Sequence, residues 1–274
     1  MDEDFRSAYG PWAVVAGAGA GMGAAFARQL AGRGLSLVLI DRDPGPIQEL
    51  AVELAGGPDA MCRAMALDLG APDAADTVLD TCETLDVGLF VANAAASHVG
   101  PFRDQDPASF EIQLRVNALT PTRIIHGLLP RFAARERAGI VIMSSLSSRR
   151  GAPLVATYAA TKAYLAVLAE SLWDELRDDG IDVLGVLPGS TRTPGWLSSN
   201  PQPGTGTASV MDAEDVVAEA LDALGGGEPT LVPGQANRDA EAFLESMERT
   251  EAVRMVGQVM RETYPADRDT DPDI

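Results

Sequence analysis

The order of apolar runs along the chain is the feature that most constrains its fold. Short, largely apolar runs alternate with longer segments that carry apolar residues at helical spacing. Strands that alternate with helices form parallel sheets, and such strands are apolar throughout where helices cover both faces. The sequence therefore predicts an α/β fold with a doubly wound parallel sheet. The predicted strands lie at residues 12–16, 35–40, 61–67, 87–92, 140–145 and 181–187.

We find no internal repeat, and no linker before about residue 190 that would divide the 274-residue chain into two domains. We therefore expect a single domain over residues 11–264. A flexible lead is expected at residues 1–10 and a flexible acidic tail at residues 265–274, because chain ends rich in charge are commonly mobile.

Two longer segments have distinct patterns. Residues 107–137 are predicted to form a long helix with a bend near Pro121. Residues 190–210 are rich in Gly, Pro, Ser and Thr, and a loop of this length is usually either disordered or a functional lid. The large apolar side chains of Trp196 and Leu197 favour the interpretation as a substrate lid.

The charge and the composition exclude several classes of protein. The net charge of −19 argues against binding to nucleic acids or anionic membranes, because both require a basic surface. We find no signal-peptide pattern and no apolar run long enough to span a membrane. Cys62 and Cys82 are too few for a disulfide framework, and no His, Cys or carboxylate cluster has metal-ligand spacing. We therefore expect a cytoplasmic protein without a catalytic metal.

A glycine run, AGAGAGMG, connects the first predicted strand to the helix that follows it. Such a turn lets the backbone approach a pyrophosphate, whose charge is met by the helix N-terminus. Gly17, Gly21 and Gly23 match the spacing GxxxGxG. Gly19, Gly21 and Ala24 match GxGxxG/A. The run predicts a dinucleotide-binding fold of the Rossmann type.

Asp41, at the end of the second predicted strand, bears on the choice of dinucleotide. A carboxylate at this place can accept hydrogen bonds from the adenosine ribose and would repel a 2′-phosphate, which favours NAD over NADP. Arg42 leaves NADP open, because an arginine at this turn can pair with a 2′-phosphate.

Lys162 is the only lysine in a chain that otherwise uses arginine for its basic residues, and it follows Tyr158 by four residues. Side chains at this spacing share one face of a helix. A nearby ammonium favours the phenolate form, so we expect Lys162 to lower the pKa of Tyr158 toward working pH. The pair predicts acid–base chemistry.

Further motifs lie along the chain in a characteristic order. Asn93 stands in VANAA, Asn117 in VNALTP and Ser145 in IVIMSS, and PGSTRTP follows the last predicted strand. Together with the glycine run and the Tyr-x-x-x-Lys pair, these motifs resemble the short-chain dehydrogenase/reductases of the single-domain type. The resemblance covers about residues 11–195, with a finer similarity to the hydroxysteroid dehydrogenase-like branch.

This resemblance implies an NAD(H)-dependent oxidoreductase that transfers a hydride between nicotinamide and a secondary alcohol or ketone. Tyr158 would be the general acid/base, and Lys162 would bind the nicotinamide ribose. Ser145 would hydrogen-bond the substrate oxygen, with the adjacent Ser144 as its rival. Asn117 would interrupt its helix and hold a water that links Lys162 to solvent.

The resemblance also implies a set of cofactor contacts. Asp68 would touch the adenine, Asn93 would steady the fourth strand, and Thr193 would lie near the carboxamide or pyrophosphate. Ala16 and Ala95 depart from the usual Thr and Gly of the family, and they bear on cofactor affinity rather than on the chemistry. The implied cofactor-binding residues are Gly17, Gly19, Gly21, Met22, Gly23, Asp41, Arg42, Asp68, Leu69, Asn93, Tyr158, Lys162, Pro188, Gly189, Thr191 and Thr193.

The substrate pocket should lie beyond the carboxyl ends of the strands. Its expected walls are largely apolar, so a steroid-like or other ring or chain substrate is predicted. Arg149 and Arg150 either meet an anionic group or are solvated. The predicted substrate contacts are Ser145, Leu146, Tyr158, His98, Leu154 and Trp196.

Three alternatives stay open at this point. In an NADPH-dependent ketoreductase, Arg42 would outweigh Asp41. A non-catalytic dinucleotide-sensing protein would keep the fold without turnover. A sugar-nucleotide epimerase usually carries a longer C-terminal domain. In the family that the chain resembles, helices matching residues 107–137 and 153–178 form dimer interfaces, so a homodimer or homotetramer is expected.

Overall fold

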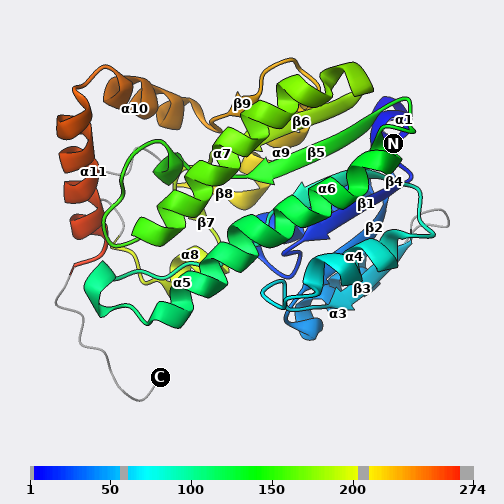
Figure 1. The fold of residues 1–274 in the computed structure, drawn as a ribbon, viewed down its shortest axis with the longest axis horizontal. Coiled ribbons are helices and arrows are strands. Elements are labelled where there is room, and N and C mark those ends of the chain that lie inside the picture. The colour runs from blue at the N-terminus through cyan, green and yellow to red at the C-terminus, as the bar shows by residue number, and fades with distance from the viewer. Residues whose placement is uncertain (1–2, 56–60, 203–209, 266–274) are drawn as a thin grey trace.

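The computed structural model describes residues 3–55, 61–202 and 210–265. Seven parallel strands form one sheet in the order β3-β2-β1-β4-β5-β6-β9 (Figure 1). This confirms the predicted doubly wound parallel sheet. The strands are β1 (Trp12–Ala16), β2 (Ser36–Asp41), β3 (Cys62–Ala66), β4 (Val87–Ala92), β5 (Ala138–Met143), β6 (Ile181–Val186) and β9 (Thr230–Leu231).

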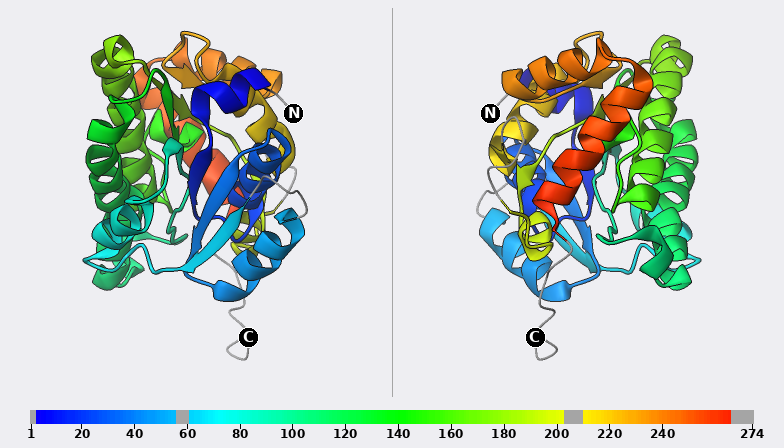
Figure 2. Two further views of the ribbon diagram at one scale, coloured as in Figure 1. Left: turned by 90° about the vertical axis from the view of Figure 1, so that its right-hand side faces the viewer. Right: turned by 90° about the vertical axis from the view of Figure 1, so that its left-hand side faces the viewer.

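Helices pack on both faces of the sheet, which separates two apolar cores (Figure 2). The central strands β1, β4 and β5 are buried along their whole length, so both of their faces must be apolar. One core is covered by α2 (Gly21–Gly32), α3 (Pro44–Leu54) and α9 (Ala213–Ala223). The other is covered by α4 (Ala74–Cys82), α6 (Thr120–Phe132) and α7 (Ala156–Leu176).

The N-terminal lead is not the flexible segment that we expected. Glu3–Tyr9 form helix α1, which lies against the start of the sheet (Figure 1). Tyr9 is buried, and its hydroxyl donates a hydrogen bond to Asp182 at 2.7 Å. The Phe5 and Tyr9 rings contact edge to face. These contacts supply the burial that a short polar lead lacks by itself.

The long helix expected at residues 107–137 is divided into three parts. Helix α5 (Pro107–Leu114) runs into a π-helical turn at Arg115–Leu119, and α6 follows. The irregularity is centred on Asn117 rather than on Pro121, which lies in the first turn of α6.

Helices α10 (Gln235–Glu245) and α11 (Arg249–Thr263) lie at the end of the molecule opposite α1 (Figure 1). The short elements β7 (Thr191–Arg192), α8 (Pro194–Ser198) and β8 (Met211–Asp212) precede them in the chain. The central part of the predicted lid, residues 203–209, and the predicted tail from residue 266 lie outside the described residues. Within the described ranges, no helix is long and apolar enough to cross a membrane.

Candidate active site

The glycine run forms a tight turn between β1 and α2. Gly17 has a φ of 78° and Gly21 a φ of 53°, a region that side chains disfavour. A Cβ at Gly23 would lie 1.8 Å from the Gly17 carbonyl oxygen. Asn93, after β4, donates its side-chain N–H to the same oxygen at 2.9 Å. The predicted fourth-strand asparagine therefore holds the glycine turn in place.

The turn fits a bound pyrophosphate. No described side chain caps the start of α2, and no acidic residue stands in its first turn. The N–H groups of that turn, with the helix dipole, are the donors that a phosphate requires. Met22 lies in this first turn and is partly buried.

Asp41 ends β2 and lies directly beside the glycine turn. One carboxylate oxygen accepts a hydrogen bond from the Gly19 N–H at 2.9 Å, and the other accepts from the Asp43 N–H at 3.3 Å. Both bonds fix the carboxylate at the edge of the turn. Arg42 is exposed.

A small apolar hollow lies beside the glycine turn, where the adenine contacts were predicted. Leu69, Ala94 and Val116 are among its lining residues. Asp68 is exposed, and its carboxylate accepts a hydrogen bond from the Gly70 N–H at 2.8 Å. The structure thus brings Leu69 to the hollow, whereas Asp68 is an exposed turn residue outside its lining.

Residues 188–193, which we call the cofactor loop, pass over the glycine turn. The Thr193 side chain would lie 2.8 Å from a Cβ at Gly21, and its hydroxyl accepts a hydrogen bond from the Trp196 N–H. Pro188 and Thr191 are buried. The cofactor loop and the glycine turn therefore form two sides of one site.

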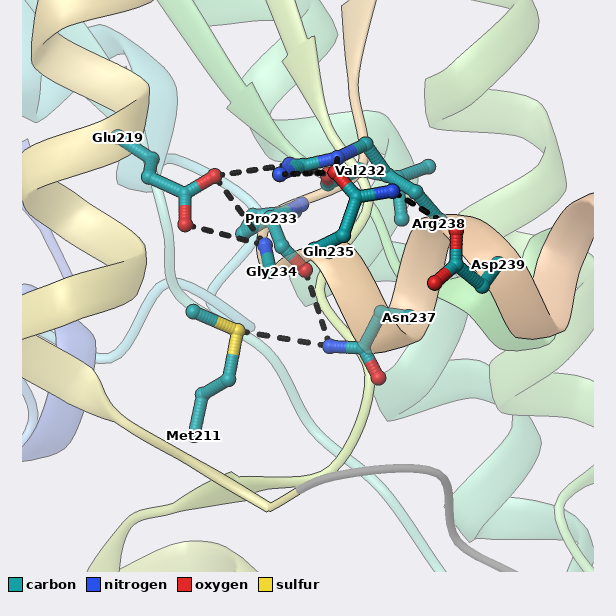
Figure 3. Close-up of polar contacts among 9 residues, drawn as sticks. All are labelled: Met211, Glu219, Val232, Pro233, Gly234, Gln235, Asn237, Arg238 and Asp239. Carbon is teal, nitrogen blue, oxygen red and sulfur yellow. Dashed lines mark hydrogen bonds and ion pairs between the residues drawn. The ribbon is translucent and has the colours of Figure 1, made fainter.

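The cofactor loop is supported from behind by α10. A Cβ at Gly189 would lie 2.8 Å from the side-chain oxygen of Asn237. Asn237 donates its side-chain N–H groups to the Pro233 carbonyl at 3.0 Å and to the Met211 sulfur at 3.4 Å (Figure 3). Met211 in turn donates its N–H to the Ser190 carbonyl.

The predicted catalytic side chains converge at the carboxyl edge of β5. Ser145 follows this strand, and Tyr158 stands in the first turn of α7. The two predicted serines differ in environment: Ser144 is buried and donates its hydroxyl to the Lys162 carbonyl at 2.7 Å. Ser145 is half-buried and accepts hydrogen bonds from the N–H and hydroxyl of Ser147. Ser145 is therefore the serine that faces the site.

Asn117 connects the π-helical turn to two other parts of the site. Its side chain exchanges hydrogen bonds with the backbone of Ala96, at 2.7 and 2.8 Å, and donates to the Thr161 hydroxyl at 3.0 Å. The asparagine thereby holds the loop after β4 against α7. Its predicted water relay stays a prediction.

Burial holds the pKa of Tyr158 above its usual value rather than near working pH, and the predicted action of the Lys162 charge on it stays a prediction. Burial raises the pKa of Tyr158 to about 12, although the Ser145 hydrogen bond acts in the opposite direction. The Lys162 ammonium points at the Met143 carbonyl, 2.7 Å away, and lies 5.5 Å from the centre of the Tyr158 ring. Burial lowers the pKa of Lys162 to about 8, because the charged form is poorly solvated there.

The predicted substrate contacts differ in how far they are exposed. Leu146 and Leu154 are half-buried in the segment that joins β5 to α7, and Trp196 is half-buried in α8. His98, on the loop after β4, is exposed. Leu154 has a φ of 69°, and its carbonyl accepts a hydrogen bond from the Gly100 N–H.

Sequence reasoning missed the contribution of α11. Val256 and Met260 pack in one apolar cluster with Tyr158 and Val99. Tyr264, at the end of α11, accepts a hydrogen bond from the Ser199 hydroxyl. The four-residue spacing of these α11 side chains was visible in the sequence, but their partners were not.

Sequence reasoning also missed the role of the two arginines after Ser145. Arg150 is neither solvated nor available to an anionic ligand, because it is buried and forms an ion pair with Glu241 of α10. Arg149 is partly buried, and its guanidinium lies 3.7 Å from the Glu170 carboxylate. The carbonyl of Arg149 accepts a hydrogen bond from Arg249 at the start of α11.

Fold and site together define a nicotinamide-dependent oxidoreductase of secondary alcohols and ketones. The chain belongs to the short chain dehydrogenase family, whose model matches residues 11–204. It is 31% identical to a 7β-hydroxysteroid dehydrogenase from Clostridium sardiniense, over 93% of this chain and 98% of that protein. The sequence-based resemblance, including its hydroxysteroid dehydrogenase-like branch, is thereby confirmed.

Two solved structures are similar in fold. One belongs to a study of 7β-hydroxysteroid dehydrogenase stereoselectivity, with a TM-score of 0.85, 28% identity, and coverage of 93% of this chain and 99% of that one. The other is a short-chain dehydrogenase from Sphingobium yanoikuyae in complex with NADPH. Its TM-score is 0.76 with 28% identity, over 87% of this chain and 97% of that chain.

Proposed function

We propose that the protein interconverts bulky, apolar secondary alcohols and their ketones, with NAD(H) as cofactor and Tyr158 as acid/base. The proximity of Tyr158 and Ser145 carries this proposal: the serine hydroxyl is close enough to the phenol to act on its pKa. It places a phenol and a second hydroxyl together at the carboxyl edge of the sheet, beside the glycine turn. Two such groups can bind and exchange a proton with the same substrate oxygen.

Each residue has a defined task in this proposal. A bound nicotinamide supplies the hydride acceptor or donor. Tyr158 takes the proton from the alcohol or returns it to the ketone, and Ser145 hydrogen-bonds the same oxygen. Lys162 binds the nicotinamide ribose and stabilises the phenolate by its charge. Asn117 holds a water that connects Lys162 to solvent.

Asp41 supports NAD rather than NADP. Its carboxylate is fixed beside the glycine turn by the N–H groups of Gly19 and Asp43, where it would accept hydrogen bonds from ribose hydroxyls and repel a phosphate. The related Sphingobium enzyme binds NADPH. Arg42 is the residue of this chain that would favour that alternative, because it is exposed and adjacent to Asp41.

The substrate class follows from the apolar walls. Leu146 and Leu154 are half-buried in the segment between Ser145 and Tyr158, and Val256 and Met260 of α11 pack in one apolar cluster with Tyr158. A hydroxysteroid-like ring substrate matches such walls by burial of apolar surface. The similarity to 7β-hydroxysteroid dehydrogenases supports the same class.

The first experiment is a turnover assay with purified protein, NAD⁺ or NADP⁺, and a panel of apolar secondary alcohols that includes hydroxysteroids. Formation of reduced nicotinamide is followed by absorbance, with Tyr158→Phe as the control. Turnover with NAD⁺ that disappears in the control supports the proposal. Turnover with NADP⁺ alone overturns the cofactor assignment. Cofactor binding without any turnover would favour the non-catalytic dinucleotide-sensing alternative.

We also propose a homo-oligomer in the cytoplasm. Exposed apolar side chains lie on the helical layer formed by α5, α6 and α7, among them Leu119, Tyr164 and Val167. A second copy would cover this surface. Val167→Asp should lower the mass measured by light scattering if the surface is an interface. Both cysteines, Cys62 and Cys82, are free thiols, which suits a reducing compartment.

A further inference from the structure

Helix α10 buries polar side chains where a helix ordinarily buries apolar ones. Asn237 and Glu241 are its buried residues, with exposed fractions of 3% and 7%. They are four residues apart and therefore share one face. Burial of a polar group costs free energy unless the group is hydrogen-bonded. Helix α10 is therefore docked by specific polar contacts on this face.

One end of α10 is fixed to the cofactor loop. Asn237 stands behind Gly189 and binds Met211, whose N–H reaches Ser190. A second contact anchors the same end to α9, where Glu219 accepts hydrogen bonds from the Gly234 N–H and from Arg238 (Figure 3). The start of α10 is thus held by two neighbouring elements.

The middle of α10, one turn further along, is fixed to the segment at residues 145–158, which we call the serine–tyrosine segment. One terminal nitrogen of Arg150 donates to both oxygens of Glu241, at 2.9 and 2.7 Å. The two side chains are only 6% and 9% exposed. Apolar residues of similar volume often replace a buried ion pair without loss of stability. The pair therefore contributes a defined geometry more than stability.

The serine–tyrosine segment needs such a restraint. Leu154 adopts a left-handed backbone conformation, which a leucine keeps only where the surroundings hold it. Ser145 begins the segment and Tyr158 ends it, so its shape sets the separation of the two hydroxyls. The Gly100 hydrogen bond to the Leu154 carbonyl and the Arg150–Glu241 pair are two of its anchors.

We propose that α10 is a positioning arm that ties the serine–tyrosine segment to the cofactor loop. In this arm, Glu241 and Arg150 are positioning residues that hold Ser145 and Tyr158 at their working separation. Neither residue touches the reacting atoms. The inference rests on the proposed function of Ser145 and Tyr158.

The test replaces the pair by apolar residues of similar length, Arg150→Met with Glu241→Met. The matched control is Arg28→Met with Glu53→Met, a pair that is about half exposed and lies between α2 and α3. We expect kcat for alcohol oxidation to fall by about tenfold or more in the first double variant, because small displacements of reacting groups are costly. Cofactor affinity should stay within about twofold, since the Asn237 end of α10 is intact.

The pH profile of kcat distinguishes a positioning role of the Arg150–Glu241 pair from a role in overall stability. The Ser145 hydrogen bond lowers the pKa of Tyr158, so its loss should move the profile of kcat to higher pH. Hydrogen exchange of the amides at residues 146–155 should become faster than in the control. The Arg150→Lys variant keeps the charge of the pair but changes its geometry, and it carries the same expectations if the double variant does not fold.

The inference would be overturned if a folded variant kept the kcat, the pH profile and the hydrogen-exchange rates of the parent protein. If the parent protein oxidises no secondary alcohol, the proposed function fails. In that case the exchange of residues 146–155 alone decides whether α10 restrains the serine–tyrosine segment.

Discussion

Removal of the Lys162 charge should shift the pH dependence of alcohol oxidation. Oxidation requires the phenolate form of Tyr158, so kcat/KM should rise with pH until the pKa of this group is reached. The ammonium of Lys162 lies 5.5 Å from the centre of the Tyr158 ring. Two unit charges at that distance interact by about 3 kcal/mol at an effective dielectric constant of about 20.

This interaction corresponds to about 2 pH units. In Lys162→Met the rising limb of kcat/KM should therefore move to higher pH by about 2 units, and below that limb the rate should be about 100-fold lower. The effect is greatest near neutral pH, because burial lowers the pKa of Lys162 to about 8 and the ammonium loses its charge above it.

The assay measures kcat/KM from the absorbance of reduced nicotinamide between about pH 6 and 10, on the rising limb below the pKa of about 12 to which burial raises Tyr158. Tyr158→Phe should lack the limb altogether. Lys162→Arg retains the positive charge, so it should shift the limb less than Lys162→Met. A shift below about half a pH unit in a folded Lys162→Met variant would show that the charge does not act on the phenolate.

Three further outcomes are expected. Gly23→Ala should abolish cofactor binding in a titration, because its Cβ would lie 1.8 Å from the Gly17 carbonyl oxygen. Tyr9→Phe should lower the free energy of unfolding in urea by about 1–2 kcal/mol, since a hydrogen bond to the charged Asp182 is lost, and should leave kcat unchanged. Lys162 has its pKa lowered from 10.5 to about 8 on folding, so the unfolded chain binds the extra proton between these values. Stability should therefore rise with pH through this window in the parent relative to Lys162→Met, as denaturation at several pH values would show.

The sheet could be predicted because each of its strands is recognisable from a short stretch of sequence. Whole strands such as β1 and β4 are apolar on both faces, and a glycine run marks the turn that follows β1. Helix α1 could not be predicted in this way. Its docking depends on Tyr9 reaching Asp182, which lies 173 residues further along the chain.

The candidate site divides in the same manner. Ser145, Tyr158 and Lys162 could be grouped from the sequence, because strand ends and first helical turns share one edge of a parallel sheet. The direction of the Tyr158 pKa could not, since spacing alone does not show that the phenol is buried.

The pairing of Arg150 with Glu241 was equally hidden, because the two residues are 91 positions apart. A buried partner far along the chain is therefore the kind of feature that local pattern does not reveal.

Because Lys162 is the only lysine of the sequence, it can also serve as a chemical probe of local opening. Lys162 is 2% exposed, and it is the only side chain of the sequence that carries a primary amine. Acylating reagents can reach it only when this buried side chain becomes exposed. The rate of its acylation would thus report how often this part of the active site opens. In protein labelled with isotopic lysine, an NMR spectrum would show a single lysine side chain, that of Lys162.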